Sequence, residues 1–178
     1  MPAAPGAILQ DHEGRTALRF ERTLGHSPER VWRALIEPDQ QSSWHPTPAE
    51  FDPREGGAVR YSPEGDVPDM REGEVTEYDP PRVLAHTWGD DHLRWELRPE
   101  DDGCVLVLVH TFDDHFKAAR DAAGWHLCLD WLVSSLDGAP TPRDEGTERS
   151  SGGWRELNRD YEERFGIPHD KATPPPER

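Results

Sequence analysis

The sequence predicts an α+β fold in which an antiparallel sheet curls against one long C-terminal helix. Three observations support this prediction: short runs in which apolar and polar residues alternate, turn-forming residues between those runs, and an apolar helical segment that begins after residues 113–115 and runs to Gly138. A strand, short helices, a series of adjacent strands and a final long helix form an order typical of this class. At 178 residues, the chain has the length of a single domain.

The first strand and the first helix are predicted near the start of the chain. Apolar and polar residues alternate over residues 16–24, which predicts a strand. A helix should follow, because Ser27 is a favourable N-cap and Pro28 is favoured at the first helical position. Pro38 is expected to end this helix.

The remaining strands are predicted at short spacing. Gly56 and Gly57 can adopt positive φ angles, so we expect them at a tight hairpin turn. Turn residues separate further alternating runs, and we predict strands at residues 71–79, 82–88, 92–98 and 104–112. Short runs separated by turns favour an antiparallel sheet.

The segments that flank this predicted domain, residues 15–138, differ from it in composition. Residues 1–14 are expected to form an N-terminal arm rich in Pro and Gly. Residues 139–153 contain no periodic apolar residue and are expected to form a flexible connector. Residues 167–178 are expected to form a disordered tail.

An amphipathic helix is predicted at residues 154–166, between the connector and the tail. Four large apolar residues recur there at spacings of three and four: Trp154, Leu157, Tyr161 and Phe165. Burial of such side chains contributes roughly 1.5–3 kcal/mol each, so we expect this stripe to be buried. It can pack on its own domain or on a second copy of the chain, and we favour its own domain.

Charge and composition exclude several classes of partner. The chain has 36 acidic and 20 basic residues, which gives a formal charge of −16, and no Lys/Arg cluster offers a surface for nucleic acid or an anionic membrane. The longest apolar run, residues 105–109, is far shorter than the roughly 20 residues that span a bilayer. The N-terminus does not resemble an export signal. We therefore expect a cytoplasmic protein in which Cys104 and Cys128 are reduced and half-buried.

Several motifs in this order resemble one protein superfamily. They are "SPERVWRAL", "WHP", "FDPREGGAVRY", "GEVTEYDPPRVLAHTW", and "HTF" followed by "GWHLCLDWL", and together they cover residues 15–138. This set resembles the SRPBCC (START-like) superfamily. Within it, the set is similar to the family named after the C-terminal domain of the activator of the 90-kDa heat-shock protein ATPase.

The resemblance implies a helix-grip fold, in which a curved antiparallel sheet wraps a long C-terminal helix and leaves a mostly apolar cavity between them. Relatives in the superfamily bind lipids, polyketides and hormones, and some are cyclases or hydrolases, so the fold does not fix the activity. The resemblance to the co-chaperone covers one domain only. Stimulation of a chaperone ATPase is therefore not expected.

Candidate ligand-binding residues are those expected to face this cavity. They are Trp44, Tyr61, Leu84, His86, Trp88, Trp95, His110, Trp125 and Leu129. Strand alternation places His86 on one face with Leu84 and Trp88, and it places His110 on one face with Leu108. If these faces point inward, either histidine is a candidate general acid or base, and the alternative is a hydrogen-bonded core histidine. The tryptophans either fill the core or surround a flat hydrophobic ligand.

Two other polar groups have simpler interpretations. His126 and Asp130 are four residues apart on the helix face opposite the apolar residues, so we interpret them as its solvated flank rather than a catalytic pair. The run "HTFDDH" at residues 110–115 contains possible metal ligands. We expect its aspartates to cap the long helix instead, and we predict neither a metal nor a cofactor.

The sequence therefore favours a protein that binds a small hydrophobic molecule, lipid-like or aromatic and polyketide-like, in a cavity between the sheet and the long helix. One alternative is a cyclase or hydrolase of the same fold that uses a cavity histidine. Another is a co-chaperone-like or dimeric protein-interaction module. We expect a monomer or a homodimer.

Overall fold

The computed structural model describes residues 6–61, 72–140 and 152–174 and contains one antiparallel sheet with helices against it. The eight strands pair in the order β1-β2-β8-β7-β6-β5-β4-β3. Their bounds are Ile8–His12 (β1), Arg15–Leu24 (β2), Ala49–Phe51 (β3), Ala58–Tyr61 (β4), Glu72–Asp79 (β5), Val83–Trp88 (β6), Asp91–Glu100 (β7) and Gly103–Phe112 (β8). The helices are Pro28–Ile36 (α1), Pro38–Gln41 (α2), Ala118–Leu136 (α3) and Gly152–Phe165 (α4), with a 3₁₀ turn at His115–Lys117 (η1).

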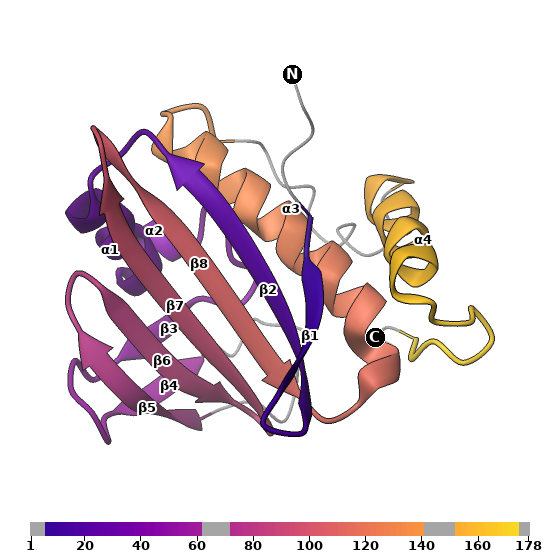
Figure 1. The fold of residues 1–178 in the computed structure, drawn as a ribbon. Coiled ribbons are helices and arrows are strands. Elements are labelled where there is room, and N and C mark those ends of the chain that lie inside the picture. The colour runs from indigo at the N-terminus through magenta and orange to yellow at the C-terminus, as the bar shows by residue number, and fades with distance from the viewer. Residues whose placement is uncertain (1–5, 62–71, 141–151, 175–178) are drawn as a thin grey trace.

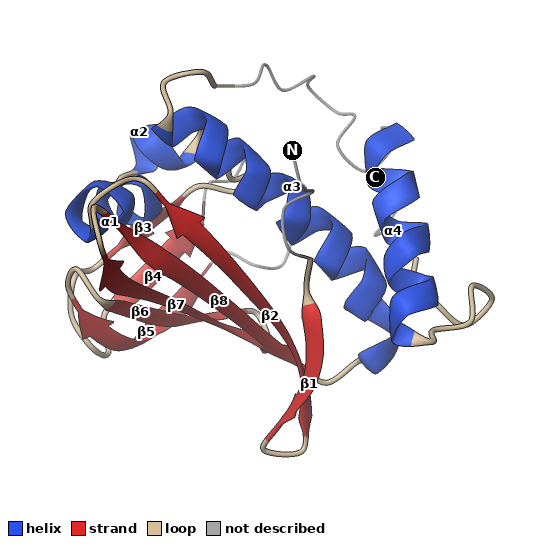
Figure 2. Ribbon diagram, turned by 45° about the horizontal axis from the view of Figure 1, so that its top comes forward, coloured by secondary structure: helices blue, strands red, loops and turns tan. Residues whose placement is uncertain are grey.

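The elements form layers, with α3 between the sheet and α4 (Figure 1). Figure 2 shows the same arrangement after rotation, with α1 and α2 together at one end of the sheet. This is the helix-grip α+β fold that the sequence predicts, and α4 adds a further layer over the long helix.

The strand register decides which side chains reach the interior. His86 pairs with Leu93, which pairs with His110, and His110 pairs with Leu18 on β2. All four residues in this row are buried. Because side chains alternate along each strand, the next row points to the opposite face, and its Arg94 is half-exposed. The sequence predicts that at least one of His86 and His110 points inward, and both side chains are buried in the interior.

Local signals in the sequence produce most of the predicted elements. Ser27 caps α1, since its Oγ accepts a hydrogen bond from the Arg30 amide at 3.3 Å. Gly56 has a φ of 71°, as the turn between β3 and β4 requires. The strands predicted from alternation all form, within one or two residues of the expected bounds.

The N-terminal arm contains a strand that the sequence analysis did not predict. β1 pairs antiparallel with β2, and the chain reverses between them at Glu13 and Gly14, both with positive φ. Only five residues form this strand, and Ile8 is 56% exposed, so it has no clear alternation of buried and exposed positions. The short helix α2 also forms beyond Pro38, where a helix end was expected.

The C-terminal segment packs on its own domain, as favoured from the sequence. In the predicted stripe, Trp154 and Tyr161 are buried, and Leu157 and Phe165 are half-buried against the core. The connector prediction falls mostly on residues 141–151, which lie outside the described residues. Because the stripe packs against the core, α4 covers the side of α3 that faces away from the sheet (Figure 2).

The prediction of a disordered tail is wrong for residues 167–174. Ile167 is only 4% exposed, and the Thr173 amide donates to the Phe116 carbonyl at 3.0 Å. The Thr173 hydroxyl bonds an Asp114 carboxylate oxygen at 2.7 Å, and Arg120 donates to the Pro174 carbonyl at 3.0 Å. One buried isoleucine and a few polar contacts thus hold a segment whose composition alone predicts no order.

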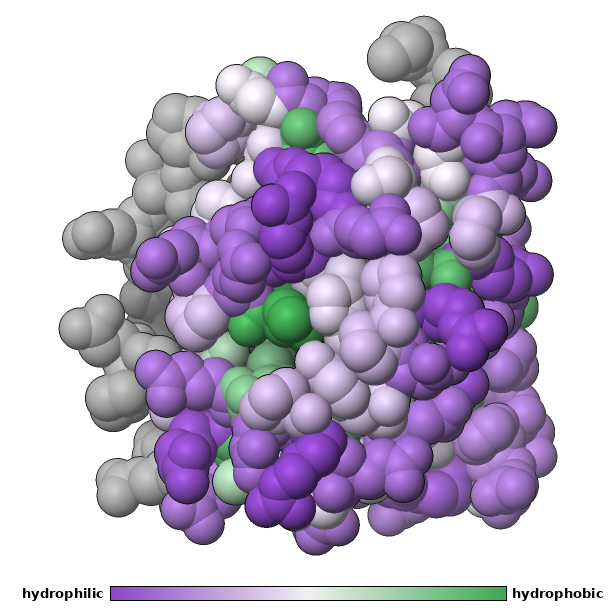
Figure 3. All heavy atoms as spheres, turned by 90° about the vertical axis from the view of Figure 1, so that its left-hand side faces the viewer, coloured by the Kyte–Doolittle hydropathy of each residue, from purple (hydrophilic) through white to green (hydrophobic). Residues whose placement is uncertain are grey.

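No helix within the described ranges is both long and apolar enough to cross a membrane. The face on the left of Figure 1 is shown in Figure 3, where hydrophobic areas are small and lie among hydrophilic side chains. The described residues on that face therefore form no large apolar surface.

Candidate functional site

Four tryptophans meet between the sheet and α3, where the sequence predicts the ligand cavity. Measured between ring centroids, Trp95 lies 5.8 Å from Trp44 and 5.5 Å from Trp125, and Trp88 lies 5.7 Å from Trp125. All three contacts are close to edge-to-face, an arrangement that contributes roughly 0.5–1.5 kcal/mol per pair beyond burial. The tryptophan cluster therefore largely fills the space expected for a ligand. Core packing, one of the two alternatives left open by the sequence, accounts for Trp44 and Trp95, while Trp88 and Trp125 also line a second space.

A small space, the inner cavity, remains beside this cluster. It has a volume of about 20 Å³, which is room for roughly one water molecule, and His86, Tyr61, Trp44 and Trp95 contribute to its wall. It is therefore much smaller than the cavity that the sequence analysis expects.

His86 is held as a neutral core residue next to the inner cavity. Its Nδ1 lies 3.2 Å from the Tyr61 hydroxyl and 3.2 Å from the Thr87 carbonyl oxygen. Burial lowers the pKa of His86 to about 4, and burial raises the pKa of Tyr61. At neutral pH, His86 is therefore uncharged and a weak base.

A larger pocket lies outside the tryptophan cluster and is partly open to solvent. We call it the α3–α4 pocket, and its volume is about 80 Å³. On α3 its wall is a stripe of residues at helical spacing: Arg120, Gly124, Leu127, Cys128 and Trp131. Trp154 closes the wall from α4, and His45, Pro46, Trp88 and Trp125 complete it on the side of the sheet, with Asp121 beside Arg120. The pocket thus combines four indole rings with a charged end.

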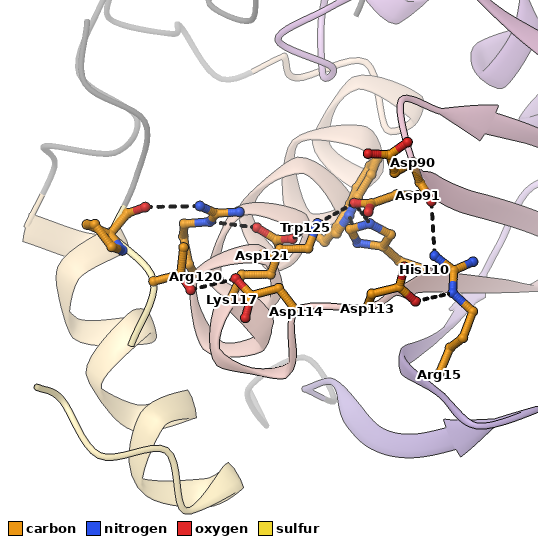
Figure 4. A network of polar contacts seen from close by, with 12 residues as sticks. Arg15, Asp90, Asp91, His110, Asp113, Asp114, Lys117, Arg120, Asp121 and Trp125 are labelled. Atoms are coloured by element: carbon orange, nitrogen blue, oxygen red, sulfur yellow. Dashed lines mark hydrogen bonds and ion pairs between the residues drawn. The ribbon is translucent and has the colours of Figure 1, made fainter. Parts of the chain in front are cut away.

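A chain of hydrogen bonds and ion pairs holds Trp125 and Asp121 in the wall of this pocket, and Figure 4 shows its residues. Trp125 donates its indole N–H to His110 Nδ1 at 3.0 Å, and His110 Nε2 lies 2.7 Å from an Asp91 carboxylate oxygen. Because an indole is a donor only, His110 Nδ1 must be the acceptor, and the proton of the neutral ring is on Nε2, facing Asp91. His110 has no exposed surface and lines neither cavity. It positions Trp125 rather than facing a ligand.

Charged residues continue this chain to the pocket wall. Lys117 bonds Asp91 and lies 3.3 Å from Asp121, which in turn lies 2.8 Å from Arg120 (Figure 4). Burial acts to raise the pKa of Asp91, but the hydrogen bonds from His110 and Lys117 and the positive charge of Lys117 outweigh it and keep that pKa below its ordinary value. Asp91 is therefore ionised at neutral pH, and each charge in the chain has an opposite neighbour.

Three of these residues form a group with possible metal ligands. One atom each of Asp91, His110 and Asp121 lies within 4.8 Å of the others. However, the Lys117 ammonium already contacts both carboxylates, and His110 Nδ1 accepts from Trp125. An ion at this position would have to displace Lys117, so the donor set fits an internal ion pair better than a metal site.

The interpretation of His126 as part of a solvated flank is wrong. Its Nδ1 lies 2.8 Å from the Tyr161 hydroxyl of α4, which also accepts a hydrogen bond from the Ala7 amide at 2.9 Å. Asp130, 3.6 Å from His126 Nε2, remains 44% exposed. The sequence places the pair correctly on the far face of α3, but α4 and the N-terminal arm cover the histidine there.

The sequence-predicted site residues divide into three groups. Trp88 and Trp125 line the α3–α4 pocket. The second group lines only the small inner cavity and consists of Trp44, Tyr61, His86 and Trp95. Trp88 lines this cavity as well. Leu84, His110 and Leu129 are buried and line neither space, so we correct their assignment to core residues.

Sequence reasoning missed most of the α3–α4 pocket. Arg120, Gly124, Leu127 and Trp131 follow helical spacing, and this stripe was a signal available from the sequence alone. The stripe lies apart from the single apolar face that the sequence predicts for α3. Trp154 was predicted to be buried, but its position in the pocket wall depends on how α4 docks.

The fold and its layers define this protein as a helix-grip protein of the SRPBCC type. The family model described as "Activator of Hsp90 ATPase homolog 1-like protein" matches residues 25–137. The chain belongs to this family, as the sequence motifs indicate. No curated protein matches the sequence.

Solved structures of similar proteins confirm the fold. CalU16 from Micromonospora echinospora, in solution, is 18% identical with a TM-score of 0.71, and the match covers 96% of this chain and all of that chain. The conserved protein of unknown function EF2215 from Enterococcus faecalis is 22% identical with a TM-score of 0.70, over 90% of each chain. A protein encoded by BPP1335 from Bordetella parapertussis is 26% identical with a TM-score of 0.63, over 94% of this chain and 96% of that chain.

Proposed function

We propose that this protein binds a small hydrophobic molecule with an aromatic ring, and that the ring enters the α3–α4 pocket. The observation that carries this proposal is the wall of the pocket, in which four indole rings surround a space of about 80 Å³ that is partly open to solvent. Aromatic walls with a few polar groups at one end are typical of small-molecule sites. Membership of the family is consistent with such a role.

The dimensions of the pocket favour a compact ligand over a lipid chain. Drug-sized ligands occupy pockets of roughly 300–1,000 Å³, several times the space between α3 and α4. The ligand is therefore a molecule that inserts one ring and leaves the rest at the pocket mouth. The inner cavity, at about 20 Å³, has too little room for a lipid.

The two alternatives receive less support from the geometry. The predicted cyclase or hydrolase uses His86 or His110 at the ligand, whereas His86 borders a space for one water and His110 is enclosed by Trp125 and Asp91. A filled interior agrees with an interaction module. However, the amphipathic helix that such a module would use is packed against α3.

The proposal is tested by isothermal titration calorimetry with two probes, 2-naphthol for the aromatic class and lauric acid for lipids. We expect 2-naphthol to bind, and Trp131→Ala and Trp154→Ala each to reduce its affinity at least tenfold. Trp32→Phe is the matched control, because Trp32 packs against Tyr78 on another side of the molecule and lines neither cavity. Binding of lauric acid alone, or equal affinity in all variants, contradicts the proposal.

A further inference from the structure

Gly124 is an unusual residue for the middle of α3. It is the seventh residue of a 19-residue helix, where glycine is less favourable than alanine by roughly 1 kcal/mol. Two reasons commonly explain a glycine, a positive φ or a close neighbour, and neither applies. Gly124 has helical geometry, and a Cβ atom built on it would have no heavy atom within 4 Å outside its own helix backbone and chain neighbours.

At two other glycines in the fold, neighbouring backbone atoms leave no room for a Cβ atom. A Cβ at Gly103 would lie 2.0 Å from the Leu24 carbonyl oxygen, and one at Gly73 would lie 2.6 Å from the Thr87 carbonyl oxygen. Real side chains essentially never approach so closely, so both positions require glycine. Nothing in the described residues imposes the same requirement on Gly124.

The empty space above Gly124 is part of the α3–α4 pocket. Gly124 lines the pocket, together with Arg120 one turn earlier and Leu127 and Cys128 one turn later on the same side of α3. A methyl group at Gly124 would therefore project into the pocket and reduce a volume that is only about 80 Å³.

We infer that Gly124 is a specificity-determining residue, which leaves a bare strip of helix backbone on which a flat aromatic ring of the ligand lies. The inference rests on the proposed function and adds the shape of the ligand to it. A planar ring makes full contact with a flat strip and with the indole rings beside it, whereas a puckered saturated ring of the same size does not. The charged end of the pocket, Arg120 and Asp121, is then available to a hydroxyl or carbonyl group on the ring.

The test compares 2-naphthol with its saturated counterpart, decahydro-2-naphthol, by calorimetry on full-length protein. Wild type should bind 2-naphthol at least tenfold more tightly than the saturated compound. Gly124→Ala should lose most of that preference through weaker binding of 2-naphthol. Its melting temperature should rise, because alanine is the better helix former and meets open space, which shows that the loss is not caused by unfolding.

Ser134→Ala is the matched control, since Ser134 is a half-buried residue of α3 that lines neither cavity. It should leave both affinities unchanged. If wild type prefers 2-naphthol and Gly124→Ala binds it equally well, the role of Gly124 is overturned while the proposed function stands. If wild type binds neither compound, both are overturned.

Discussion

The two spaces beside Trp88 are both lined by tryptophans and differ in how much room those rings leave. Trp44, Trp88 and Trp95 line the inner cavity, which has a volume of about 20 Å³ and lies between the sheet and residues 35–51. On the other side, Trp88 and Trp125 join Trp131 and Trp154 around about 80 Å³ that is partly open to solvent.

This difference has a structural cause. The rings of the tryptophan cluster come from strands and helices whose positions the sheet fixes, so they pack to the density of a core. The α3–α4 pocket shares Trp88 and Trp125 with that cluster, but α4 adds Trp154 to its wall and Gly124 supplies no side chain. Tryptophan content alone therefore does not indicate a ligand site, and the decisive feature is which layers contribute the rings.

The largest expected effect is the loss of a ring from the tryptophan cluster. Trp95 is 4% exposed and contacts two other indoles, so Trp95→Ala should lower the free energy of unfolding by about 3–5 kcal/mol. Trp131 is half-buried at the pocket, and Trp131→Ala should cost much less, about 1 kcal/mol. Urea unfolding at pH 7 measures both. Equal costs would show that the two regions do not differ in packing.

The second expected effect is a pH dependence of the folding stability, which arises from His86 beside the inner cavity. His86 is buried and neutral, with a folded pKa of about 4 against about 6.5 when unfolded, so the unfolded state binds more protons below pH 6.5. Stability contributed by neutral His86 is therefore complete above pH 6.5 and is lost as the pH falls toward 4, by on the order of 3 kcal/mol.

The variant His86→Phe checks this value. Phenylalanine keeps the ring beside Phe51 and leaves the Tyr61 hydroxyl with its acceptor at Thr87. Urea unfolding at pH 7 and pH 4.5 should show a smaller loss of stability on acidification for the variant than for wild type. Identical losses would mean that His86 does not titrate with the fold.

The sheet and α3 could be predicted from the sequence. The difference in packing between the tryptophan cluster and the α3–α4 pocket could not. Alternation over β2 and β5–β8 is a local signal, and it also indicates correctly that His86 and His110 point inward. Local patterns do not reveal that the interior rings would fill their space. They also do not show that Tyr161 would reach His126, because these residues are 35 positions apart.

The smallest expected effect concerns the docking of α4 on α3 and its dependence on the protonation of His126. Burial lowers the pKa of His126, Asp130 acts to raise it, and Arg22 on β2 and Arg164 on α4 lower it further. Because the Tyr161 hydroxyl already accepts from the Ala7 amide, we expect it to donate its proton to the neutral His126 ring, and protonation of His126 as the pH falls below about 6.5 should weaken the docking of α4.

Hydrogen exchange of α4 amides at pH 7.5 and pH 5.5 measures this docking. Exchange beyond its intrinsic pH dependence should be faster at pH 5.5 in wild type, and His126→Gln should reduce that change. His12→Gln, at an exposed position on β1, is the control. Equal pH dependence in wild type and His126→Gln would show that this histidine does not control the docking of α4.

The most direct test of the central claim is an NMR titration of the indole N–H signals with 2-naphthol. The seven tryptophans report on every relevant region at once. If a ligand enters the α3–α4 pocket, the signals of Trp131 and Trp154 should shift most, Trp88 and Trp125 should follow, and Trp44, Trp95 and Trp32 should change little. Largest shifts at Trp44 and Trp95 would place the ligand at the inner cavity and contradict this account.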